Sequence, residues 1–401
     1  VSLNINLNFD KNGKIKKNYE IKGYIKKAKL NILNQLKIQN LNLNFNINKN
    51  IYSLKRIDLN FKNTKLKSSL IEIKKEKNLF FVNGQFLNDR NDFNIEDLKS
   101  IFSDVFNDID IKEIEFSSEN NFSFNINKNL KLNNFKIESV INLNQLISNQ
   151  KNLKLKTYLP SFNEKIKLDG HKILINYNKN KLDIKGGGNF SFEDKTDNIS
   201  YQITKDKDNF SFNLKTKLKN NSLLLNILDY KKKEGLNSLV SIKGNFSNKK
   251  KLTFDFISLE ESDNKILIKG LDLSKRFKII DIKNLSINLK NSKKVSNKFQ
   301  LKKDNSNFLI EGEIFDASKI INNIMESDED SSSIFENFNS KINIRINKTY
   351  IDEVNYINNL NGHINYKDNK INDLELASVF SNGKKINLSI KTNNNLETIT
   401  R

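Results

Sequence analysis

The chain has no cysteine, no tryptophan, one proline and two histidines among its 401 residues. Without cysteine there is neither a disulfide nor a thiolate ligand for a metal, and the redox compartment is left open. No run of about 18 apolar residues occurs, so no segment is predicted to cross a membrane as a helix. Disulfide scaffolds, thiolate zinc sites and helical spans are therefore excluded.

Side chains that carry catalysis are also scarce. His171 and His363 are far apart in the sequence, so a zinc site built from them and carboxylates is the weaker interpretation. The triple glycine at 186–188 precedes no Gly-Lys-Ser/Thr sequence and predicts a bend in a sheet rather than a phosphate loop. The acidic residues at 326–330 lack the spacing and the glycine of a calcium loop. We expect no enzyme, cofactor or metal.

Positive charge is in excess, since 68 Lys and Arg stand against 47 Asp and Glu and give a net charge of +21. A basic chain raises the question of a nucleic-acid partner. The lysines are spread through nearly every turn and polar strand position, without an Arg-rich stripe. Abundant Asn, Lys and Ile are typical of AT-rich coding DNA, which we favour as the cause. Disorder is rejected because the chain has 28 Phe, 10 Tyr and sustained periodicity.

The sequence is rich in alternating apolar and polar residues. In 342–346, isoleucines alternate with Asn and Arg, which places the apolar side chains on one face of a strand. The same pattern occurs at 3–9, 41–47, 122–126, 210–214 and 285–289. Turn signals separate such segments, and Asn382-Gly383 favours a two-residue hairpin. The chain is therefore predicted to be an antiparallel meander.

A second repeat consists of an apolar residue, a charged residue and a glycine, as in 21–23, 242–244 and 310–312. Glycine within a strand often marks a bulge or bend, so we expect a sheet that curves repeatedly. Roughly 25 strands at about 4.8 Å each give a sheet on the order of 100 Å long, whose apolar face must be covered, closed or curled. The expected fold class is all-β with a few short helices, an elongated, curved antiparallel β-sheet forming an apolar groove of the β-taco or repeating β-groove type.

The proline, Pro160, lies in a Leu-Pro-Ser break and marks a soft boundary. Residues 1–159 are expected to form an N-terminal β-rich groove segment with an amphipathic helix near 94–106. The polar face of that helix is acidic, which favours packing on the sheet over binding to a membrane surface. Residues 160–401 are expected to form a second groove segment with a short helix near 317–326, capped by Asp316. The apolar run 223–228 is either a helix or a buried strand.

Several stretches of the second segment occur in a distinctive order. They are Leu228-Asp229-Tyr230 with the loop 231–235, Ile268-Lys269-Gly270, the strand-to-helix junction at 308–318, and the closing meander that ends at 378–383. This order resembles the AsmA-like superfamily, in particular YhdP-like proteins with a domain of the kind named DUF3971. Residues 1–159 resemble that superfamily only in the general character of their sequence. The high lysine content departs from typical relatives.

The resemblance implies a bridge-like protein that is anchored in the bacterial inner membrane by an N-terminal helix. Such proteins extend through the periplasm as a β-rich groove and support movement of phospholipid toward the outer membrane. The chain starts at Val1 rather than Met, so we expect an excerpt from which the anchor is missing. The expected partners are phospholipid, the inner membrane through that anchor, and outer-membrane or periplasmic proteins, with no nucleic acid.

The residues expected to line the groove share the apolar phase of the alternation. They are Leu3, Ile5, Phe45, Phe124, Phe212, Ile287, Ile344 and Leu388. The alternative interpretation is that each of these residues belongs to an ordinary packed core. Lysines along the rim are expected to attract anionic headgroups, with strong screening by salt. An extracellular adhesin or structural β-sandwich array, and a periplasmic assembly factor for outer-membrane proteins, are the alternatives to lipid transport.

Overall fold

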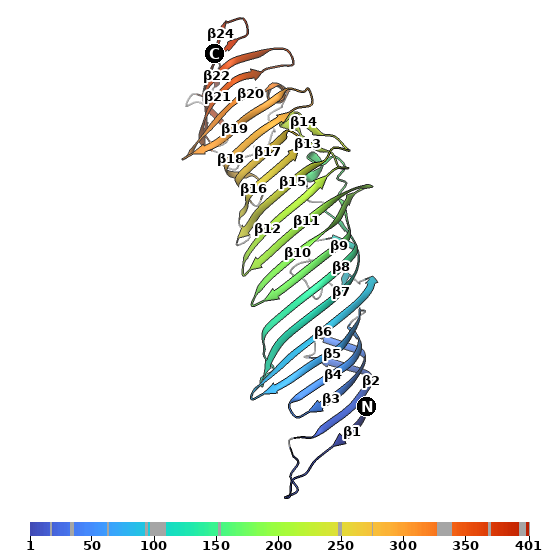
Figure 1. Ribbon diagram of the computed structural model, residues 1–401. Helices are drawn as coiled ribbons and strands as arrows, with labels where there is room; N and C mark the ends of the chain where they lie inside the picture. The colour runs from blue at the N-terminus through green and yellow to red at the C-terminus, as the bar shows by residue number, and fades with distance from the viewer. Residues whose placement is uncertain are drawn as a thin grey trace. The chain divides into compact units, whose positions relative to one another are not determined.

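A computed structural model gives the fold of the chain. It describes residues 1–16, 18–32, 36–61, 64–92, 95–96, 110–150, 154–247, 251–274, 276–326, 339–367, 370–392 and 398–400. Strands make up most of these residues (Figure 1). The expected fold class, an all-β chain with long, open and curved sheet structure, is confirmed. The chain divides into two compact units, unit 1 (1–153, 163–194 and 200–207) and unit 2 (154–162, 195–199 and 208–401), which we describe separately.

Unit 1 is a meander in which each strand pairs antiparallel with the next. Its strands are β1 (Ser2–Asn6), β2 (Glu20–Ile32), β3 (Leu36–Asn48), β4 (Ile51–Phe61), β5 (Thr64–Glu76), β6 (Leu79–Asp92), β7 (Asp110–Asn127), β8 (Leu132–Asn149), β9 (Lys165–Asn178) and β10 (Lys181–Phe192). The following strand, β11 (Lys195–Asp206), contributes residues to both units.

The register of unit 1 aligns apolar residues across the strands. Because directly opposed residues point to the same side of a sheet, matched alternation puts most apolar side chains on one face. One such row, in strand order, is Leu3, Gly23, Phe45, Leu54, Ile71, Gly84, Phe122, Ile137, Tyr177 and Leu182. We call the side of each unit that carries such rows the apolar face and the other side the polar face.

Unit 2 continues the same architecture. Its strands are β12 (Asn209–Leu218), β13 (Leu223–Leu225), β14 (Tyr230–Lys232), β15 (Ser238–Ser247), β16 (Lys251–Glu261), β17 (Asn264–Leu273), β18 (Ile279–Lys290), β19 (Ser296–Asp304), β20 (Asn307–Asp316), β21 (Ser340–Tyr350), β22 (Tyr356–Lys367), β23 (Lys370–Phe380), β24 (Lys385–Thr392) and β25 (Thr398–Thr400). Its helices are η1 (Lys154–Thr157), η2 (Asn226–Leu228) and α3 (Ser318–Glu326). The run 223–228 is thus a short strand followed by a 3₁₀ turn.

Strands β20 and β21 are parallel, which corrects the expectation of a purely antiparallel sheet. The connection between them contains α3, and a crossover of this kind brings the chain back to the same end of the sheet, so that both strands run in one direction. Asp316 accepts a hydrogen bond from the backbone N–H of Ser318 at 3.0 Å and so caps α3. The helix expected near 317–326 is therefore present, whereas the one near 94–106 lies almost wholly outside the described residues.

Several strand glycines on the apolar face lie under aromatic rings. A Cβ on Gly84 would approach the ring of Phe122 to 2.7 Å, and one on Gly244 would approach the ring of Phe212 to the same distance. Gly244, a member of the apolar-charged-glycine repeat, also lies at a register shift, as predicted. Gly84 is outside that repeat and lies beside a register shift between β5 and β6. The repeat therefore provides space for a neighbouring aromatic side chain as well as bends.

The turn at Asn382-Gly383 differs from the two-residue hairpin expected from the sequence. The N–H of Phe380 donates to the carbonyl of Lys384, and the N–H of Gly383 donates to the carbonyl of Phe380, which makes a three-residue loop. Gly383 has a φ of 83°, the left-handed conformation that closes such a loop after a type I turn. Asn382 is not left-handed, and this is why the tighter turn does not form.

Candidate functional site

The apolar face of unit 1 is closed toward one edge of the sheet and open toward the other. Leu41, Leu43, Ile57 and Leu59 are 4–8% exposed and form a packed cluster. The edge formed by the tight turns β3–β4, β5–β6, β7–β8 and β9–β10, which we call the hairpin edge, is different. Apolar-face side chains beside it are only half-buried; they are Ile47, Tyr52, Ile73, Phe80 and Ile126. A strip of apolar surface thus meets solvent there.

Aromatic side chains form a continuous row on this half-buried strip. Ring centroids are separated by 5.4 Å between Phe86 and Phe122, 5.9 Å between Phe122 and Phe124, and 6.3 Å between Phe124 and Phe135. Phe135 then contacts Tyr177 at 5.9 Å, so the row crosses β6 to β9. Aromatic rings present large, rigid apolar surfaces, and a row of them has no polar interruption.

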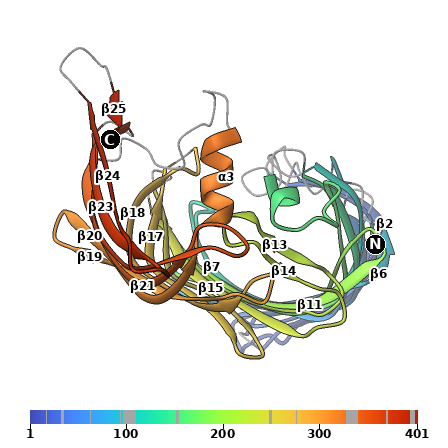
Figure 2. The same cartoon turned by 90° about the horizontal axis from the view of Figure 1, so that it is seen from above.

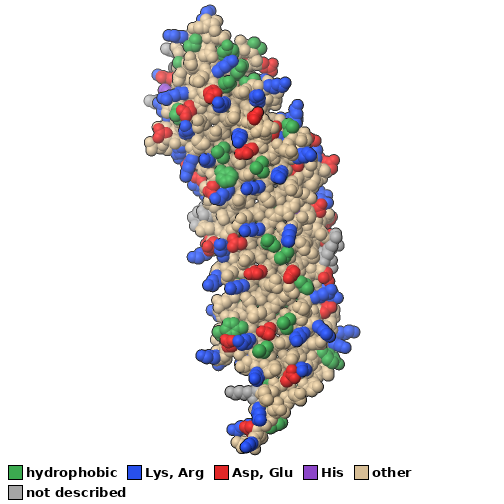
Figure 3. Space-filling model, in the orientation of Figure 1, with side chains coloured by type: hydrophobic (Ala, Val, Ile, Leu, Met, Phe, Trp, Pro, Cys, Tyr) green, Lys and Arg blue, Asp and Glu red, His purple; other side chains and the backbone are tan. Residues whose placement is uncertain are grey.

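The opposite face of the sheet is polar. Its strand positions carry Lys, Asn, Ser and Glu, for example Lys22 opposite Asn46 and Glu138 opposite Asn176. The surface drawn in Figure 3 has Lys and Arg interspersed with Asp and Glu, with only scattered hydrophobic side chains. Charges of mixed sign in solvent give no concentrated patch for one ligand. The apolar face is therefore the better candidate for a functional site.

In unit 2 part of the apolar face is covered by the chain itself. Tyr230 of β14 packs with Leu259, Ile266, Ile287 and Leu289 in a cluster of buried residues. Leucines of β13 and η2 pack against the same cluster. Figure 2 shows β13, β14 and α3 inside the curve of the unit 2 strands. We call β13, η2 and β14 the plug.

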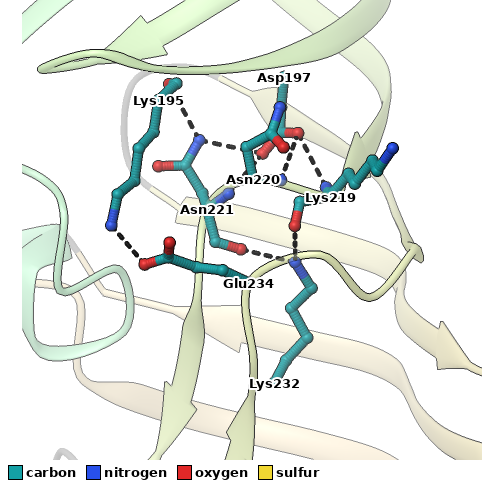
Figure 4. A network of polar contacts seen from close by, with 7 residues as sticks. All are labelled: Lys195, Asp197, Lys219, Asn220, Asn221, Lys232 and Glu234. Carbon is teal, nitrogen blue, oxygen red and sulfur yellow. Dashed lines mark hydrogen bonds and ion pairs between the residues drawn. The ribbon is translucent and has the colours of Figure 1, made fainter.

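A buried polar network ties the plug to the end of β12 (Figure 4). The ammonium of Lys232, which has no exposed surface, donates to the carbonyls of Lys219 at 2.8 Å and Asn221 at 2.7 Å. Asp197 accepts backbone N–H groups from Lys219, Asn220 and Asn221 at 2.8–2.9 Å. These contacts satisfy the polar groups where the chain leaves the sheet to form the plug.

Burial sets the protonation behaviour of this network. Desolvation lowers the pKa of Lys232, although the carboxylates of Asp197 and Glu261 act in the opposite sense. Tyr230 donates its hydroxyl to Glu261, and its pKa is raised by burial first and by that carboxylate second. Lys195 also pairs with Glu234 beside the network. These contacts hold the groups in place where the plug joins the sheet.

The structure distributes the eight residues predicted to line a groove over three environments. Leu3, Ile5 and Leu388 are 57%, 52% and 38% exposed, Phe45, Phe124, Phe212 and Ile344 are half-buried, and Ile287 is 3% exposed beneath the plug. In unit 1, Leu3 and Phe45 belong to the row described above, and Ile5 and Phe124 belong to the adjacent row.

In unit 2, Ile344 and Leu388 share a row that is mostly half-buried. Its members are Ile257, Ile268, Leu285, Leu301, Ile310, Ile344, Gly362, Leu376 and Leu388. Phe212 lies apart from this row and contacts Phe254 edge-on at 5.9 Å. Sequence reasoning missed the Phe86–Tyr177 aromatic row and the Lys232 network. The recurrence of Phe at alternate positions in 122–124 was the available signal for the aromatic row.

Both histidine side chains contact polar groups of neighbouring residues. His171 is 1% exposed, and its ring nitrogens contact the carbonyl of Asn189 at 2.8 Å and the hydroxyl of Tyr201 at 3.2 Å. His363 contacts Asp373 at 3.1 Å. Within the described part of the chain, no three His, Asp or Glu side chains gather in a way that could hold a metal ion. A search of the same residues finds no helix long and apolar enough to span a bilayer.

Comparison with known proteins adds no relative. The chain matches no family model, no curated protein and no solved structure.

Proposed function

We propose that the chain carries phospholipid acyl chains along its apolar face. The observation that supports this most is the half-buried aromatic and aliphatic strip of unit 1, which crosses many strands without a polar side chain between its rings. A contiguous apolar strip that still meets solvent is the kind of surface on which a partner or ligand binds. An acyl chain suits a long and narrow strip better than a compact ligand does.

The energy of acyl-chain burial fits such a strip. Each buried methylene contributes about 0.8 kcal/mol, so six methylenes laid on the rings contribute about 5 kcal/mol. The rows repeat similar apolar residues from strand to strand, so successive positions along the strip differ little in affinity. Binding is then strong enough to hold a chain and uniform enough to let it move. The phosphate headgroup stays in water at the hairpin edge.

The setting of this activity follows from the resemblance of residues 160–401 to the AsmA-like superfamily. On that basis the chain is the periplasmic part of a protein anchored to the bacterial inner membrane, and it moves phospholipid toward the outer membrane. Its further partners are proteins of the outer membrane or the periplasm. An adhesin or sandwich array is the weaker proposal, because such a protein packs its apolar faces sheet against sheet.

The test is lipid capture by the purified chain. Native mass spectrometry measures co-purified phospholipid, and a photo-crosslinking residue at Phe122 reports contact with an acyl chain. The double substitution Phe45→Asp with Phe124→Asp places two carboxylates on the apolar face. We expect it to lower lipid capture at least about tenfold, because an ionised group next to a methylene chain must be desolvated.

The matched control places the same charges on the polar face. Leu70 and Leu174 are 40% and 46% exposed and lie opposite Lys55 and Lys185 there. Leu70→Asp with Leu174→Asp should leave lipid capture within about twofold of the unmodified chain, since surface substitutions of this kind are nearly neutral. Urea unfolding of both variants verifies the fold. Equal capture by the two double variants would show that the apolar face is not the lipid site.

A further inference from the structure

The tight turns of the hairpin edge in unit 1 carry lysine at equivalent positions. Lys49-Asn50, Lys77-Asn78 and Lys179-Asn180 each form a two-residue loop, and Lys128 begins the three-residue loop between β7 and β8. The first three of these lysines have φ values of 48–52°, the left-handed conformation that such hairpins require. This edge lies at the left of the β5–β10 region in Figure 1. The turns direct four lysines away from the strands.

The four lysines are regularly spaced and exposed. Consecutive hairpins on one edge are two strands apart, which is about 10 Å. All four side chains are exposed, and within the described residues none of them has a salt-bridge partner. The nearest acid in these turns, Glu76, is paired with Lys74 at 2.7 Å. At physiological salt the Debye length is about 8 Å, which is shorter than this spacing, so each lysine acts on a nearby headgroup largely by itself.

The other edge of unit 1 carries charges of both signs. Glu164, Glu193 and Asp194 are exposed there, and so are Lys65 and Lys165. The loops of the hairpin edge carry lysine and no acid, so they attract a headgroup with negative charge more strongly than this mixed edge does. The half-buried strip lies beside the same hairpin edge. Lys49, for example, is two residues from Ile47, or about 7 Å along the strand, within the reach of a lysine side chain.

We propose that these four lysines, together called the lysine edge, bind the headgroups of anionic phospholipids while the acyl chains lie on the adjacent strip. The ligand class is a phospholipid with net negative charge, such as phosphatidylglycerol, in preference to zwitterionic phosphatidylcholine. The inference rests on the proposed function, because it names the headgroup that the same site prefers. Each phosphate contacts one or two ammonium groups as the lipid moves from hairpin to hairpin.

The experiment measures lipid capture from two kinds of vesicle, pure phosphatidylcholine and phosphatidylcholine with phosphatidylglycerol. Native mass spectrometry counts each lipid bound to the full chain. We expect phosphatidylglycerol to be enriched about five- to tenfold over its share of the vesicle, the effect of one or two lysines near an anionic lipid. Raising the salt from 0.15 to about 0.5 M should remove most of that enrichment.

Two variants that lose the same net charge test whether the lysine edge causes the enrichment. One carries Lys49→Gln, Lys77→Gln, Lys128→Gln and Lys179→Gln; the control carries Lys55→Gln, Lys136→Gln, Lys172→Gln and Lys185→Gln, all exposed on the polar face. The lysine-edge variant should capture both lipids in proportion to the vesicle, and the control should keep the enrichment. Glutamine keeps a polar side chain without the charge, and melting curves verify that both variants fold.

The outcomes separate this inference from the proposed function. Lipid capture without enrichment in the unmodified chain, or equal enrichment in both variants, overturns the lysine edge and leaves acyl-chain binding intact. Failure of the unmodified chain to capture either lipid overturns the proposed function itself. Enrichment that persists at high salt contradicts an electrostatic headgroup site.

Discussion

The plug in unit 2 is held to the sheet by the buried ammonium of Lys232, and its removal should loosen the plug. Lys232→Met keeps an unbranched side chain, one atom shorter, and removes the charge and all three donors. The carbonyl of Lys219 would still accept the N–H of Gly235 at 2.8 Å. The carbonyl of Asn221 would lose its contact with the ammonium, which lies at 2.7 Å. The substitution therefore removes the hydrogen bond of one buried acceptor outright and weakens a second.

The size of the expected destabilisation follows from the number of buried carbonyls that lose a donor. A buried acceptor left without a donor costs about 1–3 kcal/mol, and the second carbonyl adds little because it retains a donor. Methionine recovers part of this loss, because its thioether needs no desolvation whereas the ammonium does. We expect the free energy of unfolding of unit 2 to fall by about 2 kcal/mol. A value above about 5 kcal/mol would mean that the network acts as a unit and not through one carbonyl.

Urea unfolding and amide hydrogen exchange measure the effect globally and locally. Exchange should accelerate most for the amides of 223–232, since the plug makes few hydrogen bonds to the rest of the sheet. Lys233→Met is the control, because Lys233 is the exposed neighbour and its loss should change stability by less than about 0.5 kcal/mol. If Lys232→Met is as stable as Lys233→Met and its plug amides exchange at the same rate, the reasoning about the buried carbonyl is refuted.

Two further perturbations test the sheet itself. Gly84→Ala should destabilise unit 1 by about 1–3 kcal/mol in urea unfolding, because the new Cβ would lie 2.7 Å from the ring of Phe122, and Phe122→Leu in the same chain should restore part of the loss. The side-chain hydrogen bond from Asn365, and after it the contact with His363, lower the pKa of Asp373. The contribution of Asp373 to stability is therefore present above pH 3.8 and disappears as the pH falls through the lower folded-state pKa. The stability difference between the unmodified chain and Asp373→Asn should accordingly shrink below pH 3.8 in pH-dependent unfolding; a constant difference would contradict the assignment.

The strands and their faces could be predicted from the sequence because alternation is a local property. In 342–346 each isoleucine is one strand position from a polar residue, and the structure places all three isoleucines on the apolar side of β21. Turn chemistry was less informative. Asn382-Gly383 occurs in a three-residue loop because only the glycine takes the left-handed conformation, a choice that the dipeptide alone does not determine.

Coverage of the apolar face could not be predicted, because it depends on contacts between distant segments. Ile287 and Ile344 have the same local pattern, yet Ile287 is buried beneath Tyr230 and Ile344 is half-buried. The apolar run 223–228 gave no sign of what it packs against, since its partners at 259–289 lie more than 30 residues away. The parallel pair β20–β21 was missed for the same reason.

The parts of the apolar face that the chain itself covers also decide where an acyl chain can lie. In unit 2 the plug occupies the apolar face above Leu259 and Ile287, so a lipid tail there would have to displace Tyr230 and its bond to Glu261. No such displacement is needed on the strip of unit 1. Opening the plug would break the Lys232 hydrogen bonds and would also expose Tyr230 and the leucines of β13 and η2, at about 1.5–3 kcal/mol for each side chain. This cost exceeds the gain from burying about three to six methylenes, at about 0.8 kcal/mol each. We therefore expect acyl chains to lie on the strip of unit 1 and not beneath the plug.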